Sequence, residues 1–433
     1  EGNDTIKDYY GTNSILAGGG ADEIHIAGES AFIYAGSDAS NDRIYYSDLT
    51  GTTTIVAGLG DDRIERRHIS ELTERVHENL IVYLDEEDGE TNNDGNDVYI
   101  SSDPHLSTKI YGRGGNDNIT TNAVNIFADG GIGNDTITGY QTSSYSRYEK
   151  FGDPSEFEWR ASLKGGEGED TLGFSYYSNI HYDWDHDFVL DGGPGHDIIH
   201  SEGGWNPGNG WTRNPGIRAL GGDGNDTFRI NGFVKDIVLS GESGSDLFVL
   251  HENHYLNKLE WPSRHGVEST FTITDFETGE SGDVLDINAF LPFITDSAYD
   301  GGNPFTQYLK LKQDGNDAIL EFDKDGSDTT TGFIEIVRLS NTNVANFTLE
   351  NLSPQVSTSG SPVPGVLIDR SSETDPQTIE GGLGKDTLIG GRAGDLINSS
   401  GSADHLEGNQ GNDTFDGGLG NDTIEGDEGN DTI

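Results

Sequence analysis

The 433-residue chain contains no cysteine and no methionine, and only 32% of its residues are hydrophobic. Without cysteine there can be no disulfide bond and no thiol nucleophile, which fits a secreted bacterial chain that does not use disulfides. No apolar run is long enough to cross a bilayer, so we expect no transmembrane segment. Lysine and arginine number 25 against 77 acidic residues, and the formal net charge of −52 argues against nucleic acid as a partner.

Glycine and aspartate, by contrast, are abundant and regularly spaced near the C-terminus. Six consecutive blocks on a nine-residue repeat, the last one truncated, fill residues 381–433, each with a glycine-rich turn, an aspartate and a short strand with one inward apolar residue. The glycines allow backbone angles closed to other residues and bring carbonyl oxygens close together. Two blocks, 18 residues, make one coil of a parallel β-roll, so alternate aspartates should stack on opposite flanks. One flank would hold Asp386, Asp404 and Asp422, and the other Asp395, Asp413 and Asp431.

Holes lined by carboxylate and carbonyl oxygens would lie between the stacked turns. A hard cation that accepts six or more oxygens at about 2.3–2.6 Å suits such a hole, which favours calcium over zinc. The blocks resemble the motif G-G-x-G-x-D-x-U-x of the RTX (repeats-in-toxin) proteins, which bacteria export and which bind Ca²⁺. Four turn glycines join the six aspartates as candidate calcium ligands: Gly381, Gly384, Gly417 and Gly420. Two turns depart from the motif, because Ser399 and Ser400 replace the glycine pair and Gly394 directly precedes Asp395.

A diluted form of this pattern runs through the first 250 residues. Aspartates follow glycine-containing turns at steps of 18 to 35 residues, and we interpret each step as one coil of an irregular solenoid. They are Asp4, Asp22, Asp42, Asp62, Asp97, Asp117, Asp135, Asp170, Asp197, Asp226 and Asp246. Eight are predicted calcium ligands: Asp22, Asp62, Asp117, Asp135, Asp170, Asp197, Asp226 and Asp246.

Strand-like runs rich in β-branched and aromatic residues precede most of these turns. They are NSILA, AFIYA, TTIVA, STKIY, VNIFA, DFVLD, GIRAL and DIVLS. The expected coil is therefore strand, calcium turn, strand and a freer return turn that tolerates insertions. Only one flank of this solenoid would keep an ion ladder, and the fold class is all-β.

Residues 271–352 differ in kind, because alternating apolar residues predict antiparallel strands around a small core. The segment resembles the β-domain near the end of many type I secreted proteins, which implies a module that caps the β-roll. The residues that carry the resemblance are Ile273, Asp275, Phe276, Gly279, Asp283, Leu285 and Asp286. Asp323, Asp325, Gly326 and Asp328 look like a calcium loop, with a spacing that does not match an EF-hand. We expect a solenoid over residues 1–270, a Pro/Ser-rich linker over 353–378 and a regular β-roll over 379–433.

Catalytic motifs are missing, since the chain has neither HExxH nor G-x-S-x-G, and we expect no enzyme. Asp103-Pro104-His105 is similar to a fragment of the catalytic motif of alginate epimerases, but the neighbouring tyrosine and basic residues are absent. A second group has metal-ligand residue types, although we interpret it as a solvated loop. It comprises His181, Asp183, Asp185, His186 and Asp187.

Insertions between the coils carry Trp159, Trp205 and Trp211 among tyrosine, arginine and glycine, residue types that dominate protein interfaces. Covering the open side of the solenoid is an equal alternative for them. Residues 65–80 predict one amphipathic helix, because four apolar residues recur at helical spacing. These are Ile69, Leu72, Val76 and Leu80. The segment is also the densest basic stretch, so contact with an acidic neighbouring subunit is a second interpretation.

Together these features predict an extracellular, calcium-dependent structural protein of a bacterial surface, as the subunit of a surface layer, filament or matrix. Bound Ca²⁺ ions would neutralise a chain that is otherwise expected to be disordered, with affinities of about 10⁻⁴ to 10⁻³ M. The expected partner is another copy, in a polymer or sheet. The RTX resemblance implies type I export, and the chain stops within a repeat, so we expect a longer parent protein. The alternatives are an adhesin segment that binds a surface glycan and the calcium-binding tail of a secreted enzyme.

Overall fold

The computed structural model describes residues 2–49, 51–67, 79–85, 95–101, 105–143, 160–178, 187–204, 216–231, 236–251, 270–326 and 332–433. The chain divides into two compact units, Glu1–Phe276 and Glu277–Ile433. Long parallel sheets dominate, which confirms the predicted all-β solenoid. Among the described residues, no helix combines the length and the hydrophobicity that crossing a membrane requires.

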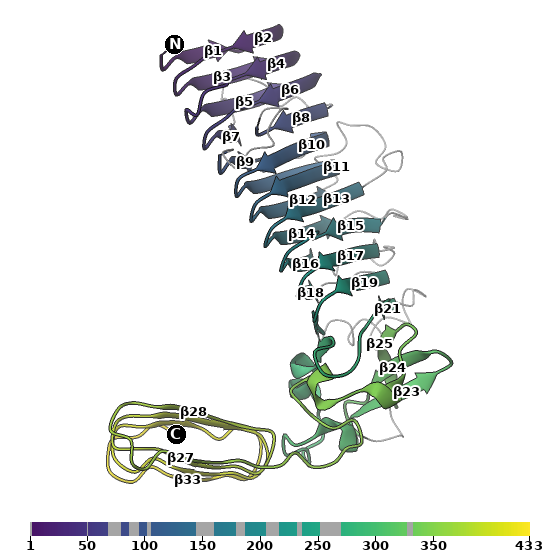
Figure 1. Ribbon diagram of the computed structural model, residues 1–433, viewed down its shortest axis with the longest axis vertical. Coiled ribbons are helices and arrows are strands. Elements are labelled where there is room, and N and C mark those ends of the chain that lie inside the picture. Colours follow the sequence, from purple (N-terminus) through teal and green to yellow (C-terminus); the bar gives the residue numbers. More distant parts are fainter. Residues whose placement is uncertain are drawn as a thin grey trace. The chain divides into compact units, whose positions relative to one another are not determined.

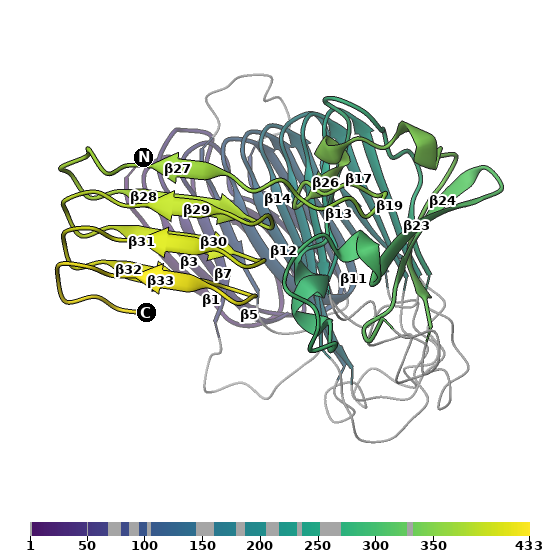
Figure 2. The ribbon, with the colours of Figure 1, turned by 90° about the horizontal axis from the view of Figure 1, so that it is seen from below.

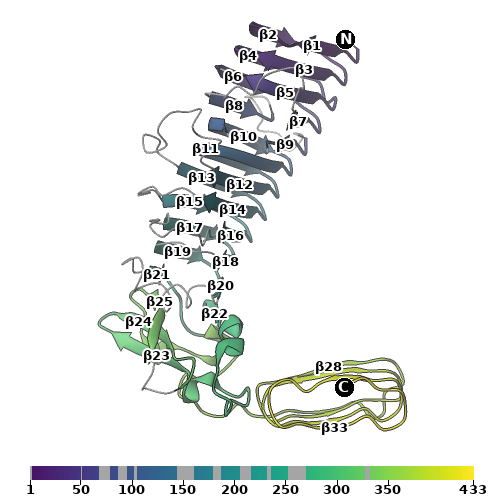
Figure 3. The same cartoon turned by 180° about the vertical axis from the view of Figure 1, so that it is seen from behind.

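The first unit is a parallel solenoid in which each coil gives one strand to each of two sheets (Figure 1). Sheet A contains β1 (Thr5–Asp8), β3 (Glu23–Gly28), β5 (Arg43–Leu49), β7 (Arg63–Arg66), β9 (Val98–Ile100), β11 (Asn118–Ile132), β12 (Thr136–Ser143), β14 (Thr171–Ser178), β16 (Ile198–Gly204), β18 (Thr227–Asn231) and β20 (Leu247–Val249). Sheet B contains β2 (Thr12–Leu16), β4 (Ser30–Tyr34), β6 (Thr52–Val56), β8 (Asn79–Tyr83), β10 (His105–Gly114), β13 (Arg160–Glu167), β15 (Asp187–Asp191), β17 (Gly216–Asp223), β19 (Asp236–Ser243) and β21 (Thr270–Ile273). Strand β11 is long enough to pair in both sheets. Figure 3 shows the same stack from behind.

In-register pairing places equivalent positions of successive coils on top of one another. Ile24 pairs with Ile44, and Ile44 with Ile64, so one column of side chains runs along the inside of sheet A. The column continues through Tyr99, Ile119, Ile137, Leu172, Ile199, Phe228 and Phe248, all buried. Each such side chain contributes about 1.5–3 kcal/mol by burial. Because the next residue of each strand points outward, a low overall hydrophobic content is sufficient for this narrow core.

All eight strand-like runs form strands of sheet B, as predicted. In most coils, a stretch of the chain separates the sheet A strand from the sheet B strand that follows it. These stretches are residues 68–78, 102–104, 144–159, 179–186, 205–215, 232–235 and 252–269. Residues 86–94 are the exception, because they separate β8 from β9 on the glycine-turn flank. The return flank thus receives most insertions, as the repeat pattern indicated.

The helix expected over residues 65–80 is wrong at both ends. Arg66 ends strand β7 and Leu80 lies buried in β8, where it pairs with Thr53 and Thr108. Lateral pairing with neighbouring coils overrides the helical spacing of the apolar side chains at these positions. Ile69, Leu72 and Val76 lie outside the described residues.

The second unit contains an antiparallel sheet, as predicted for residues 271–352. It comprises β23 (Leu309–Asp314), β24 (Asp317–Phe322) and β25 (Ile334–Leu339). Strands β22 (Val284–Asp286) and β26 (Leu352–Ser353) pair in parallel, and short 3-10 helices lie in the connections between the strands of this unit. These are η2 (Asn288–Phe293), η3 (Pro304–Thr306), η4 (Val344–Asn346) and η5 (Leu349–Asn351). Leu320, Phe322 and Ile336 are buried in the core of the unit.

The C-terminal part of this unit is a flattened β-roll (Figure 2). One sheet contains β27 (Leu367–Asp369), β29 (Thr387–Ile389), β31 (His405–Glu407) and β33 (Thr423–Glu425), and the other β28 (Thr378–Gly382), β30 (Leu396–Ser400) and β32 (Thr414–Asp416). The inward residues form one cluster: Ile379, Leu388, Ile397, Leu406 and Phe415. The roll begins earlier than the motif indicates, because β27 lies in the expected linker and pairs with β29 through backbone groups that need no Gly-Asp motif.

Candidate metal centre

A continuous ladder of aspartates runs along one flank of the solenoid. The backbone N–H of each ladder aspartate donates to the Oδ1 atom of the aspartate in the next coil. For example, the Asp135 N–H lies 2.7 Å from Asp170 Oδ1, and the Asp170 N–H lies 2.7 Å from Asp197 Oδ1. Ten such bonds connect Asp4 with Asp246. The ladder therefore consists of backbone N–H groups and carboxylates that the turns hold in register.

All eight aspartates predicted as ligands in this unit lie on the ladder. The ladder also includes Asp42 and Asp97. The sequence spacing places both in the series of regularly spaced aspartates, but they were not predicted as calcium ligands. Their turns, SDASND and DGND, contain fewer glycines than the motif, which made them less conspicuous. In each coil the Oδ1 atom of the aspartate thus accepts a backbone hydrogen bond. The Oδ2 atom is the oxygen that could bind a ligand.

The second oxygen, Oδ2, is buried without a hydrogen-bond partner among the described residues in most of these turns. This holds for Asp22, Asp62, Asp97, Asp135, Asp170, Asp197 and Asp226. The Asp170 side chain is only 1% exposed, so water cannot replace the missing partner freely. Because a buried carboxylate oxygen without a partner is strongly destabilising, this row of atoms calls for a cation or a proton.

Glycines leave space beside each of these oxygens. A Cβ atom added to Gly192 would lie against Asp197 Oδ2 and 2.6 Å from the carbonyl oxygen of Gly221 in the next coil. Gly165 has the same relation to Asp170 Oδ2 and to the carbonyl oxygen of Gly192. The space that a side chain would fill is therefore bounded by carboxylate and carbonyl oxygens, the donor set that Ca²⁺ prefers.

Burial raises the pKa of the ladder carboxyls, because the folded turns exclude the water that would solvate the charge. The pKa rises to about 6 for Asp170 and to about 7 for Asp135 and Asp197, with desolvation as the largest cause in each. For Asp97 it rises to about 10, through desolvation and then through the negative charge of Asp85. The turns thus disfavour bare negative charge and favour a bound cation.

Asp85 is an acidic residue that the sequence analysis missed. Its side chain is fully buried, and its charge also raises the pKa of Asp62. It directly precedes residues 86–94, the stretch that interrupts the glycine-turn flank, so no motif position marked it. Within the described part of the turn between β8 and β9, Asp85 and Asp97 are both buried carboxylates, which favours a cation there.

The β-roll carries two ladders, one on each flank, in the predicted arrangement. Asp386 donates through its N–H to Asp404 Oδ1 at 2.7 Å, and Asp404 donates in the same way to Asp422 at 3.0 Å. On the opposite flank Asp395 donates to Asp413 at 2.7 Å, and Asp413 to Asp431 at 3.0 Å. The Oδ2 atoms of Asp404 and Asp413 are buried and without a hydrogen-bond partner in the described chain. Asp386 and Asp395 differ, because their Oδ2 atoms accept the N–H groups of Gly382 and Gly391 at 2.6 Å.

The four candidate glycines of the roll divide into two kinds. Gly381 and Gly417 lie beside Asp386 Oδ2 and Asp422 Oδ2, where a Cβ would enter the candidate site. Gly384 and Gly420 instead approach carbonyl groups of an adjacent turn, so glycine there serves the close backbone packing. The departing turn with Ser399 and Ser400 keeps the ladder geometry, with Ser400 at a φ of 71°. Metal binding by these residues stays a prediction.

The other candidate sites have little described structure. Asp323 is buried and its Oδ1 accepts the N–H of Asp325 at 3.3 Å, while Asp328 lies outside the described residues. Also outside them are Asp103, Pro104, the four residues His181, Asp183, Asp185 and His186, and the three tryptophans Trp159, Trp205 and Trp211. His105 and Asp187 begin strands β10 and β15. Within the described ranges, no three acidic or histidine side chains form a metal cluster by themselves, so an ion in the turns would depend on backbone carbonyls.

One motif residue of the 271–352 module closes the solenoid ladder. Asp275 Oδ2 accepts hydrogen bonds from Ser240 Oγ at 2.5 Å and from the Glu242 N–H at 3.0 Å, and its Oδ1 accepts the Gly241 N–H at 3.1 Å. Ile273 and Phe276, on either side, are buried. This carboxylate therefore satisfies the backbone donors of the last turn.

Comparison with known proteins agrees with this geometry. The RTX calcium-binding nonapeptide repeat family (HemolysinCabind, 4 copies) matches residues 1–25, 127–141, 189–206, 377–406 and 398–433. The matched segments include turns of the solenoid as well as the whole regular β-roll. No curated protein matches the chain significantly.

Proposed function

Because the chain belongs to the RTX calcium-binding repeat proteins, we propose that it is an extracellular structural protein of a bacterial surface whose folding and assembly depend on Ca²⁺. RTX repeats bind calcium and imply an exported protein. The proposal goes further, to a subunit of a surface layer, filament or matrix without catalytic activity. The observation that carries it is the unbroken ladder of aspartates from Asp4 to Asp246, which are buried from Asp22 onward.

Electrostatics explains why the ladder would couple folding to calcium. Neighbouring coils of a parallel stack lie about 4.8 Å apart, so the ladder brings carboxylates together along a line at that spacing. The formal net charge of −52 adds a general repulsion that opposes compaction. Calcium ions at the turns would neutralise the row and satisfy the Oδ2 atoms at once. The free energy of ion binding then becomes free energy of folding.

A structural role suits a solenoid of this kind. Its stability is a sum over coils that contact only their neighbours, so ions along the whole flank stiffen an elongated element. The inward columns of Ile, Leu and Phe are narrow, and the outward faces stay available for contacts with other copies. In the low calcium of the cytosol the chain would remain loosely folded, and it would fold after export.

The proposal is tested by adding Ca²⁺ to the purified chain in chelator and following light scattering and electron micrographs at pH 7.5. We expect growth of sheets or fibres at about 1–10 mM Ca²⁺, above the affinities typical of extracellular sites. Magnesium at the same concentration is the control for ionic strength and charge. Folding into a stable monomer would contradict the structural role and would favour an adhesin segment or the tail of a secreted enzyme.

A further inference from the structure

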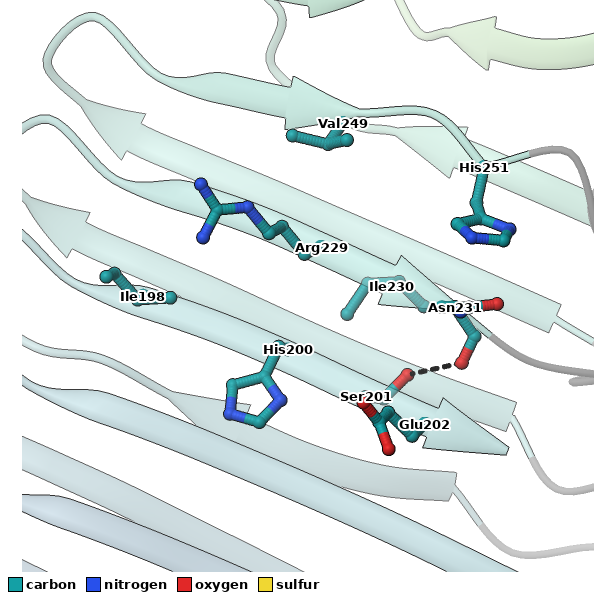
Figure 4. Close-up of a pocket in the computed structure, with 9 residues that line it drawn as sticks. All are labelled: Ile198, His200, Ser201, Glu202, Arg229, Ile230, Asn231, Val249 and His251. Carbon is teal, nitrogen blue, oxygen red and sulfur yellow. Dashed lines mark hydrogen bonds between the residues drawn. The ribbon is translucent and has the colours of Figure 1, made fainter. Parts of the chain in front are cut away.

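A cavity of about 290 Å³ lies on the outer face of sheet A, over strands β16, β18 and β20 (Figure 4). Its lining residues are Ile198, His200, Ser201, Glu202, Arg229, Ile230, Asn231, Val249 and His251. The calcium ladder does not explain this group, because it combines cationic, anionic and apolar side chains on the outward side of the strands. Its volume is close to the lower end of small-molecule sites, about 300 Å³.

The basic side chains of the cavity are Arg229 and His200, which are direct neighbours in the pairing of β16 with β18. Arg229 is exposed, and among the described residues it makes no ion pair. An unpaired guanidinium is unusual in a chain with 77 acidic residues and 25 basic ones. Its planar fork of donors matches a carboxylate, with which it can form two parallel hydrogen bonds.

Gly173 of strand β14 makes room for the His200 ring. A Cβ added to Gly173 would lie 2.6 Å from Cε1 and 2.7 Å from Nε2 of His200. Gly173 pairs with His200 in the sheet, so the imidazole lies over the neighbouring strand. Glycine inside a strand is destabilising relative to alanine and often marks a close approach of this kind.

The remaining groups determine what else a ligand must offer. Glu202 follows the histidine by two residues on the same strand, and its negative charge acts on the His200 ring. Burial lowers the pKa of His200 and keeps the ring neutral at pH 7, so it can accept or donate one hydrogen bond. Ser201 Oγ donates to the backbone oxygen of Asn231 at 3.5 Å. Ile198 and Val249 supply apolar surface at opposite sides of the cavity (Figure 4).

We propose that this cavity binds a small hydroxy-carboxylate, such as a uronic acid unit. Arg229 receives the carboxylate, Glu202 and His200 hydrogen-bond hydroxyl groups, and Ile198 and Val249 contact the C–H face. A sulfate ion offers Glu202 no donor, and a phosphate dianion adds a second negative charge to the repulsion by Glu202. A neutral sugar would leave the guanidinium without its anion.

The test is titration calorimetry of the calcium-loaded chain with D-glucuronate, D-lactate, acetate, D-glucose and inorganic phosphate. We expect both hydroxy-acids to bind, and the other three to bind at least about tenfold more weakly, because each loses a charged hydrogen bond or gains a repulsion. An oligouronate that binds as tightly as the monomer would assign the site to an acidic polysaccharide. Binding of the monomers alone would assign it to a free acid. Equal binding of glucuronate and glucose, or no binding of either acid, would overturn the proposal.

Three variants make the test specific. Arg229→Gln should weaken glucuronate at least about tenfold, the loss expected for a charged hydrogen bond. Arg218→Gln removes an equally exposed arginine from sheet B and should bind as the wild type does. Gly173→Ala changes no charge but displaces the His200 ring, and it should weaken binding while calcium binding persists. Unchanged affinity in both Arg229→Gln and Gly173→Ala would refute the site.

Discussion

The Asp170→Asn substitution should stabilise the fold in chelator and should remove part of the stabilisation that calcium provides. In the fold, Asp170 Oδ1 accepts the Asp135 N–H at 2.7 Å, and asparagine keeps this acceptor. What changes is the charge and the nature of Oδ2, which has no hydrogen-bond partner within the described residues. In chelator the loss of a buried charge stabilises the fold, and in calcium the loss of a ligand offsets most of this gain.

The magnitudes follow from the pKa and from ion binding. A pKa near 6, against an ordinary value of 3.8, corresponds to about 3 kcal/mol for keeping Asp170 ionised in the fold at pH 7.5. Because the folded pKa is the higher one, protonation stabilises the fold fully below about pH 3.8, and this stability is lost as pH rises through about 6. One calcium site with a dissociation constant of about 10⁻³ to 10⁻⁴ M contributes about 1.4–2.7 kcal/mol at about 10 mM Ca²⁺.

Circular dichroism measures both effects. In chelator, the Asn variant should keep its β spectrum to a higher pH than the wild type does. At pH 7.5 its β signal should rise less steeply with Ca²⁺ than that of the wild type, because one ion fewer binds on folding. Asp8→Asn is the matched control, since it removes the same charge from the end of strand β1 outside the ladder. A variant that is destabilised under both conditions would refute the reasoning, because Asp170 would then act only through packing.

Three further predictions concern other turns. Gly408→Ala should destabilise the calcium-loaded roll by about 1–3 kcal/mol, because the added Cβ would contact Asp413 Oδ2 and the Phe415 ring. The control is Gly382→Ala, whose Cβ would enter open space. Equal thermal midpoints for the two variants would contradict this prediction. Calcium affinity should fall as pH decreases from about 8 to 5, and calcium binding should release protons. The reason is that protons compete with calcium at carboxyls with raised pKa values, about 8 for Asp62 and about 7 for Asp135. Calorimetry in two buffers of different ionisation enthalpy measures the proton release, and its absence would contradict buried carboxylate ligands. Asp85→Asn should weaken one calcium site at least about tenfold, because it removes a buried charge beside Asp97; an unchanged calcium isotherm would exclude Asp85 from a site.

The ladders and the sheet B strands could be predicted because their signal is strictly periodic. A nine-residue repeat fixes the register of Asp386 on Asp404 and of Asp395 on Asp413 without any knowledge of the core. In most coils of the solenoid, the aspartate ends a glycine-containing turn and lies two residues before a buried apolar side chain. One aspartate therefore marks one coil, even where successive aspartates are 35 residues apart. Local pattern and tertiary pairing agree at these positions.

The remaining features depend on contacts between coils that no local pattern records. Leu80 follows a helical spacing but pairs laterally with neighbouring strands, and β27 joins the roll through backbone groups alone. Asp85 becomes important only because the fold buries it near Asp97. The cavity at Arg229 arises from three coils, and its one local sign, Gly173, looks in the sequence like any other glycine of this glycine-rich chain.

The central claim is that the ladder makes folding depend on calcium, and a far-ultraviolet circular dichroism titration at pH 7.5 tests it most directly. Starting in chelator, the account predicts little β structure, then a cooperative rise in β signal centred at about 10⁻⁴ to 10⁻³ M Ca²⁺, with no such rise for Mg²⁺. A full β spectrum already present in chelator, unchanged by calcium, would contradict it.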